Sequence, residues 1–181
     1  MSHIDALDPA AASGHTRELL DAVKKGLGVV PNLFRVTAQS AVALEGMVGL
    51  NGAITKGTLG ARIREAIALA VAEADGCDYC LSAHTYLGKH AGLNDADITL
   101  ARGGDSSDPR IAAAARFARL LIEKRGHVTE ADRTGVRAAG FGDAQILEII
   151  ANVAWSVFTN YVNVVAGTDI DFDPVVRHEV A

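Results

Sequence analysis

Both cysteines of the chain lie in the stretch GCDYCLSAH, residues 76–84, which ends in a histidine. Two residues separate Cys77 from Cys80, and His84 follows Cys80 by four positions. These residue types at this spacing are able to form a redox couple, to bind a metal ion, or to pack as small apolar side chains. The choice among these three alternatives determines most of what the protein does.

The expected position of the two cysteines on a helix favours reactive thiols. Gly76 is predicted to end one helix, which places Cys77 near the N-cap of the next helix and Cys80 in its first turn. Unpaired backbone N–H groups and the helix dipole stabilise a thiolate there, and thiols of such motifs reach pKa values of roughly 3.5–7. Two cysteines on one first turn are close enough for a disulfide. His84 lies on the same helix face as Cys80 and is placed to exchange a proton with its sulfur.

A glutamate on the preceding helix is a second candidate for proton transfer. Residues 61–74 and 78–91 are expected to form an antiparallel helical hairpin that turns near Asp75 and Gly76. Glu65 and His84 lie at similar distances from that turn, so we expect them to be level with each other. Apolar residues surround Glu65 on its helix, and burial there would raise the pKa of the carboxyl group. Glu65 therefore joins His84 and the two cysteines as a candidate relay.

The pattern E-x11-C-x2-C-x3-H, formed by Glu65, Cys77, Cys80 and His84, resembles the signature of the alkylhydroperoxidase D (AhpD-like) family. This family is part of the carboxymuconolactone decarboxylase superfamily of all-helical oligomers. The segment RIREAIALAVAEADGCDYCLSAHTYLGKHAGL is similar to the family throughout, and VPNLFRV and NYVNVVAGTDIDF resemble its peroxidase-related branch. The resemblance implies an all-α, AhpD-like fold and a homo-oligomer, trimeric or hexameric.

The same resemblance implies a role for each residue of the pattern. Cys80 matches the cysteine that attacks a peroxide and becomes a sulfenic acid, and Cys77 matches the resolving cysteine that condenses with it to a disulfide. Glu65 and His84 match the proton-relay residues of the family. Well-studied members have a histidine directly before the second cysteine, where this chain has Tyr79. The implied reactants are a hydroperoxide and a dithiol reductant, such as a lipoylated or thioredoxin-like protein, without a cofactor, in antioxidant defence.

Other interpretations of the same residues stay open at this point. Cys77, Cys80 and His84, together with Glu65 or His90, offer ligand types that bind zinc, although their spacing matches no familiar zinc module. A lyase of the carboxymuconolactone decarboxylase type would not need the cysteines. A non-enzymatic metal-binding or redox-sensing protein would use them without turnover, and the plainest alternative is a buried apolar pair.

The composition narrows the class of protein. Of the 181 residues, 49% are apolar and 22% charged, as expected for one globular domain over residues 1–181. The net charge of −5 disfavours nucleic acid as a partner. The stretch ILEIIANVAWSVFTNYVNVVAG is long enough to cross a membrane, but Glu148 and three asparagines interrupt it, which favours a buried helix. Because the N-terminal sequence lacks the pattern of an export signal, we expect a cytoplasmic protein.

The elements that must position the candidate residues are predicted to be about nine helices, because period-3.6 patterns dominate and alternating patterns are scarce. The expected boundaries depend on capping residues and helix breakers: Thr16 and Gly26, Pro31, Ser40 and Thr55, Ala61 and Ala74, Asp78 and Ala91, Asn94, Pro109 and Gly126, Thr129, and Asp143 and Gly167.

The last predicted helix carries a narrow polar stripe formed by Asn152, Ser156, Asn160 and Asn163. Buried polar groups need partners, so this stripe must face other polar groups, another subunit or a wet cavity. We favour packing over a pocket wall. The tail after Gly167 is expected to be extended, with Ile170 and Phe172 as its anchors.

Overall fold

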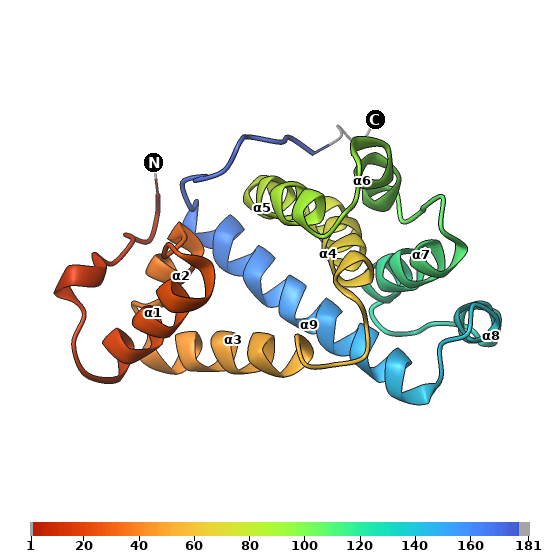
Figure 1. Ribbon diagram of the computed structural model, residues 1–181, viewed down its shortest axis with the longest axis horizontal. Helices are drawn as coiled ribbons and strands as arrows, with labels where there is room; N and C mark the ends of the chain where they lie inside the picture. Colours follow the sequence, from red (N-terminus) through yellow and green to blue (C-terminus); the bar gives the residue numbers. More distant parts are fainter. Residues whose placement is uncertain (1, 178–181) are drawn as a thin grey trace.

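The computed structural model describes residues 2–177, and its regular structure over that range is helical (Figure 1). A short 3-10 turn, Pro9–Ala11, precedes the first α-helix. The α-helices are α1 (Gly14–Leu27), α2 (Asn32–Thr37), α3 (Ala41–Ile54), α4 (Ala61–Asp75), α5 (Asp78–His90), α6 (Asp95–Arg102), α7 (Pro109–Glu123), α8 (Glu130–Ala138) and α9 (Asp143–Ala166). The predicted all-α class is confirmed.

Helices α4 and α9 form the centre of the molecule. Helix α4 packs against α5, α6, α7 and α9, while α9 runs diagonally through the fold and also contacts α2, α3, α5 and α7 (Figure 1). Two apolar clusters fill the space around α4, one toward α1–α3 and α5, the other toward α7, α8 and the first half of α9. The cysteine motif and the polar stripe therefore meet at the centre of the fold.

The helix ends agree with the predicted caps at most positions. Ser40 accepts a hydrogen bond from the Ala43 N–H at the start of α3, and capping boxes open α6 at Asn94 and α8 at Thr129. Two predicted starts are wrong by one or a few residues. Helix α1 begins at Gly14 rather than after Thr16, and α9 has Gly142 at its N-cap, with Asp143 already in the first turn. An acidic residue is favourable in that first turn as well as at the cap, because both positions meet the positive end of the helix dipole.

The α4–α5 hairpin is the element that positions the candidate residues. Gly76 adopts a left-handed conformation with φ of 70°, and the Cys77 N–H donates to the carbonyl of Ala72 at 3.0 Å, which closes α4. Gly88 of α5 lies against α4, because a Cβ atom there would be 3.9 Å from the Glu65 Cβ and 3.4 Å from Leu93. The tight turn and this close approach set Glu65 opposite His84, as the hairpin predicts.

Helix α9 is the longest of the described helices, and its sequence fits either a buried helix or a membrane-spanning one. Within residues 2–177 it is the one helix whose length and apolar composition would suffice to cross a membrane. One face is buried in the centre of the fold, as predicted. The other face is exposed and carries a stripe of large apolar residues: Leu147, Ile150, Tyr161, Val164 and Val165. The prediction of a buried helix is therefore confirmed for one face only.

The tail after α9 passes over α5 toward α6 (Figure 1). The Val175 N–H donates to Ser82 Oγ at 2.9 Å, and the Arg177 N–H donates to the Asp78 carboxylate at 3.1 Å. Phe172 packs against the rings of Tyr79 and Tyr86. The anchor predicted at Phe172 is confirmed, whereas Ile170 points outward and is 37% exposed. Residues 178–181 of the predicted tail lie outside the described part of the chain.

Candidate active site

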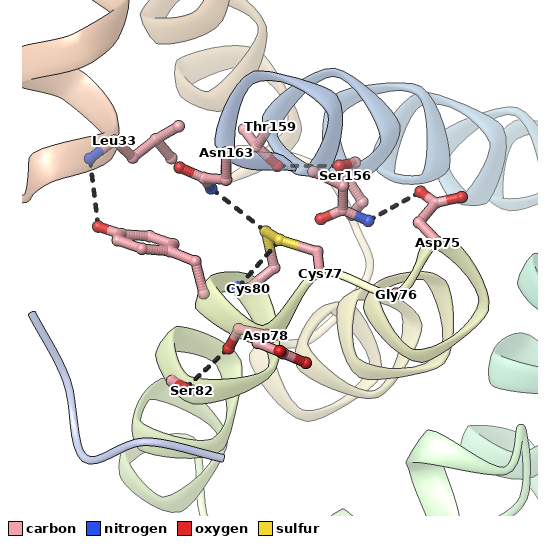
Figure 2. The surroundings of a disulfide bond; sticks show 12 residues. Leu33, Asp75, Gly76, Cys77, Asp78, Cys80, Ser82, Ser156, Thr159 and Asn163 are labelled. Carbon is pink, nitrogen blue, oxygen red and sulfur yellow. Dashed lines mark hydrogen bonds between the residues drawn. A yellow bond between two sulfur atoms is a disulfide. The ribbon is translucent and has the colours of Figure 1, made fainter. Parts of the chain in front are cut away.

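Cys77 and Cys80 form a disulfide at the start of α5 (Figure 2). Their Cα atoms are 5.3 Å apart, within the ordinary range for a disulfide. Cys77 is the N-cap residue, and its Sγ accepts a hydrogen bond from the Cys80 N–H at 3.1 Å. Both residues are buried, with 1% and 2% of their surface exposed. The predicted positions at the N-cap and in the first turn are confirmed, and the pair can cycle between dithiol and disulfide without moving the backbone far.

His84 and Glu65 form a hydrogen-bonded pair across the hairpin. The distance from His84 Nδ1 to Glu65 Oε2 is 2.8 Å, and the side chains are 9% and 17% exposed. The indole ring of Trp155 on α9 packs edge-on against the imidazole, with ring centroids 6.3 Å apart. When Glu65 is ionised, Nδ1 must carry the proton of this hydrogen bond, which leaves a lone pair on Nε2.

A cavity of about 730 Å³ connects these residues. Cys80, His84 and Glu65 line it, and the rest of the wall is mainly apolar and aromatic, including Leu33, Phe34, Tyr86, Trp155 and Phe172. Of the two cysteines, Cys80 rather than Cys77 is a lining residue. The space is large enough for an organic molecule of moderate size, and the lining is of the kind that binds apolar groups.

The polar stripe of α9 lies mostly on this cavity. Asn152, Ser156 and Asn163 line it, so the packing interpretation is wrong for these three residues. Asn163 contacts the disulfide directly: its Nδ2 donates to Cys80 Sγ at 3.3 Å (Figure 2). The sequence predicted the stripe but not this contact, because spacing along one helix does not say which distant side chain faces it.

Asn160, the fourth residue of the polar stripe, does not line the cavity. Asn160 Nδ2 donates to an Asp75 carboxylate oxygen at 2.9 Å, beside the turn of the hairpin. Burial raises the pKa of Asp75 above its ordinary value, and the hydrogen bond from Asn160 opposes that shift. For Asn160 the packing interpretation is confirmed.

Tyr79 occupies the position where the resembled family carries a histidine. Its hydroxyl oxygen accepts a hydrogen bond from the Leu33 N–H at 3.2 Å. Burial, reinforced by a hydrogen bond to the Asp171 carboxylate, raises the pKa of Tyr79 well above its ordinary value. The phenol stays protonated at neutral pH and ties α2 and the tail to α5.

A metal site is not formed by the described residues. Within residues 2–177, no three His, Cys, Asp or Glu side chains are grouped so that they could hold a metal ion. His90, considered above as a ligand, is exposed, and its Nδ1 is 2.9 Å from the Tyr86 carbonyl oxygen. Glu73, four residues before Cys77, pairs with Arg102 at 2.7 Å. Among the described residues, the two cysteine sulfurs are bonded to each other in a disulfide.

Comparison with known proteins agrees with this geometry. Residues 42–123, which include the whole hairpin, match the model of the carboxymuconolactone decarboxylase family. No curated protein sequence matches the chain. The matched segment contains Glu65, Cys77, Cys80 and His84, the residues on which the resemblance to the AhpD-like family is based.

Solved structures with the same fold include peroxidase-related proteins and a debrominase. An alkylhydroperoxidase AhpD core, a peroxidase-related protein from Ralstonia eutropha JMP134, is 24% identical with a TM-score of 0.84, covering 94% of this chain and 92% of its own. A peroxidase-related protein from Silicibacter sp. TM1040 is 23% identical with a TM-score of 0.79, covering 96% and 92%. The debrominase Bmp8, as a cysteine-to-alanine variant in complex with 2,3,4-tribromopyrrole, is 19% identical with a TM-score of 0.79, covering 94% and 92%. At these identities the likeness establishes the fold.

Proposed function

We propose that the protein is a thiol-dependent hydroperoxide reductase that uses Cys77 and Cys80 as its redox couple. One observation carries the proposal: the sulfur of Cys80 and the His84–Glu65 pair line the same apolar cavity. A nucleophile, a proton donor and a binding space for an organic group are thereby within one site, as peroxide reduction requires.

In the first step, the Cys80 thiolate attacks the terminal oxygen of a hydroperoxide ROOH. The O–O bond breaks, and the alkoxide RO⁻ takes a proton from His84 and leaves as the alcohol ROH. Cys80 has lost two electrons and is now a sulfenic acid. Glu65, 2.8 Å from His84 Nδ1, stabilises the protonated imidazole before the transfer.

In the second step, the Cys77 thiolate attacks the sulfenic sulfur of Cys80. The S–S bond forms, and the hydroxyl group takes a proton and leaves as water. An external dithiol then reduces the disulfide to two thiols and is itself oxidised to a disulfide. The complete reaction converts ROOH and two thiol groups to ROH, water and one disulfide.

The depth of the disulfide constrains the reductant. Both cysteines are nearly inaccessible, and Cys80 is reached through the cavity. A thiol on a slender arm, such as that of a lipoylated protein, fits this access better than a broad protein surface bearing a dithiol, as in a thioredoxin-like protein. We place the reaction in the cytoplasm, where dithiol reductants are maintained, and assign it to antioxidant defence.

We further propose that the protein is a homo-oligomer, a trimer or a hexamer. The exposed apolar stripe of α9, defined above, supports this assignment, because soluble monomers rarely expose this many large apolar residues on one helix. Helix α3 also exposes a large apolar residue, Val42, which is 81% exposed.

A thiol count tests the peroxidase proposal. Reduced protein is mixed with one equivalent of cumene hydroperoxide, and the remaining free thiols and any disulfide are determined by mass spectrometry. We expect loss of both thiols, a Cys77–Cys80 disulfide and one equivalent of alcohol. The Cys77→Ser variant should stop at the sulfenic acid of Cys80, whereas Cys80→Ser should not react. Survival of both thiols, or native consumption of peroxide by Cys80→Ser, would sink the proposal.

Reductive debromination is a second candidate, supported by the aromatic lining of the cavity and by the shared fold with a debrominase. The balanced reaction would convert an aryl bromide and two thiols to the arene, bromide, a proton and a disulfide. Bromide release from a brominated pyrrole by the reduced protein, without peroxide, would favour this reaction. A lyase of the decarboxylase type would instead keep its activity in the double variant Cys77→Ser/Cys80→Ser.

A further inference from the structure

Asn163 is the polar residue of α9 that touches the disulfide. Only 3% of its surface is exposed, and it lies on the cavity wall beside Cys80. Its Nδ2 donates to Cys80 Sγ at 3.3 Å, while Figure 2 shows the amide oxygen turned away from the sulfur. The residue therefore presents a donor to the nucleophile and an acceptor to its surroundings.

The acceptor of Asn163 has no partner among the described residues. Its Oδ1 is buried and makes no hydrogen bond. Leaving a buried acceptor unpaired is unfavourable, and buried polar groups are nearly always paired. An unpaired acceptor on a residue that lines the cavity, beside the Cys80 sulfur, points to a hydrogen-bond donor on the ligand.

We propose that the Asn163 amide holds both reactants of the peroxide step, its N–H donating to the Cys80 thiolate and its Oδ1 accepting from the O–H of the hydroperoxide. This assignment rests on the function proposed above. The amide thereby presents the O–H oxygen to the sulfur. As the S–O bond forms and the O–O bond breaks, that hydrogen stays on the oxygen of the new sulfenic acid. The alkoxide leaves on the opposite side with a proton from His84.

The ligand class follows from this geometry. A hydroperoxide has one O–H donor, which matches the single free acceptor of Asn163, and an organic group, which matches the apolar wall formed by residues such as Phe34, Trp155 and Phe172. A dialkyl peroxide lacks the donor and would leave Oδ1 unpaired. The site should therefore distinguish an organic hydroperoxide from a dialkyl peroxide of the same bulk.

Asn160 supplies a matched control. It lies one turn earlier on α9, is equally buried and also has an unpaired Oδ1, but its N–H donates to Asp75 rather than to the sulfur. Loss of either amide removes one hydrogen bond and one orphan acceptor. Only the loss of the Asn163 amide should lower the rate of Cys80 oxidation.

The experiment compares Asn163→Ala, Asn163→Asp and Asn160→Ala with the parent protein, all reduced. Two rates are measured for each: oxidation of Cys80 by cumene hydroperoxide, and alkylation of Cys80 by iodoacetamide, which reports the thiolate without a peroxide. Thermal unfolding confirms that each variant is folded. The isosteric Asn163→Asp keeps the packing even where Asn163→Ala loosens it, and its carboxylate cannot donate to the thiolate.

We expect Asn163→Ala to slow oxidation by about 10²-fold, in the range seen when one preorganised donor is removed. Alkylation should slow by less, and the difference between the two rates measures the contact from Oδ1 to the hydroperoxide. Asn163→Asp should lower alkylation further, because its charge lies beside the thiolate. The neighbouring His84–Glu65 pair and Cys77 are unchanged in every variant, so the shifts report Asn163 alone.

Equal effects of Asn163→Ala and Asn160→Ala on oxidation would overturn the assignment, since a merely structural amide would behave so. Equal slowing of oxidation and alkylation by Asn163→Ala would overturn the contact between Oδ1 and the substrate. If the parent protein is not oxidised by the hydroperoxide, the proposed function and the substrate contact both fail. The alkylation rates then still decide whether the N–H stabilises the sulfur.

Discussion

The imidazole of His84 is held from one side by Glu65 and from another by the edge of Trp155, so its orientation in the cavity is fixed. We expect His84→Gln to lower the rate of Cys80 oxidation by about 10²–10⁴-fold, since an amide cannot deliver a proton to the leaving alkoxide. Glu65→Gln should lower it by about 10²-fold, because the carboxylate that stabilises the protonated ring is lost. Stopped-flow measurement of Cys80 oxidation checks both values.

His90→Gln is the matched control for this prediction. His90 lies on the same helix, but its Nδ1 contacts the Tyr86 carbonyl and its side chain is exposed. It should react at the parent rate. A loss as large as that of His84→Gln would mean that general damage to α5, rather than proton transfer, explains both variants.

The residues of the candidate site differ in how far they could be predicted. Cys77, Cys80, His84 and Glu65 lie on one hairpin, so helix periodicity and a single turn were enough to bring them together. Asn163 is separated from Cys80 by 83 positions, and its contact depends on how α9 crosses the hairpin. Local patterns carry no information about such a crossing, which is set by packing throughout the core.

At the level of elements, the distance between α4 and α5 depends on Gly88. A Cβ atom there meets its neighbours at ordinary contact distances, 3.4 Å from Leu93 and 3.9 Å from the Glu65 Cβ. We expect Gly88→Ala to stabilise the protein by about 0.5–1 kcal/mol through its better helix propensity. Gly88→Leu should destabilise it by about 1–3 kcal/mol and slow Cys80 oxidation, because the larger side chain pushes His84 away from Glu65. Urea unfolding and the oxidation assay measure these effects.

Gly88→Ala and Gly88→Leu serve as controls for one another, because they differ only in the size of the side chain placed between the two helices. If Gly88→Leu retains both parental stability and parental oxidation rate, the close approach of the helices does not position the pair. If Gly88→Ala is as damaging as Gly88→Leu, the spacing is tighter than the contact distances indicate.

The turn of the hairpin gives a prediction for pH. Burial raises the pKa of Asp75 above its unfolded value, so the folded protein holds this proton more tightly than the unfolded chain does. Its contribution to stability is fully present below the unfolded pKa and is lost as the pH rises through the folded pKa. Asp75→Asn keeps an acceptor for Asn160 and removes the charge, so we expect it to be more stable than the parent at pH 7, by a fraction of a kcal/mol.

The difference between Asp75→Asn and the parent should shrink toward about pH 4, close to the ordinary pKa of an aspartate. Urea unfolding at the two pH values measures it. A stability difference that is the same at both pH values would show that charge at this position is not involved.

Helix existence was predicted better than helix ends. The caps of α3, α6 and α8 have side chains that pair with backbone N–H groups, and these ends were predicted correctly. Ser13 and Gly142 make no such side-chain bond at the starts of α1 and α9, and there the prediction failed. When no side chain caps the N-terminus of a helix, the sequence contains little information about where that helix begins.

At the level of the whole molecule, the outer face of α9 predicts assembly. We expect sedimentation to give a trimer or a hexamer, and the double variant Leu147→Lys/Tyr161→Lys to shift it toward smaller species, since two buried charges in an interface are costly. Leu100→Lys, on α6, is the control, because Leu100 is exposed but lies apart from this stripe. A parent protein that sediments as a monomer would contradict the prediction.

The depth of α9 also bears on how the chain is made. The amide that covers the Cys80 sulfur follows it by 83 residues, and the tail that crosses α5 follows later still. Ribosomes add about 5–20 residues per second, so the nascent cysteine pair waits roughly 4–17 s for the helix that encloses it. During that interval neither Asn163 nor the rest of α9 covers the Cys80 sulfur.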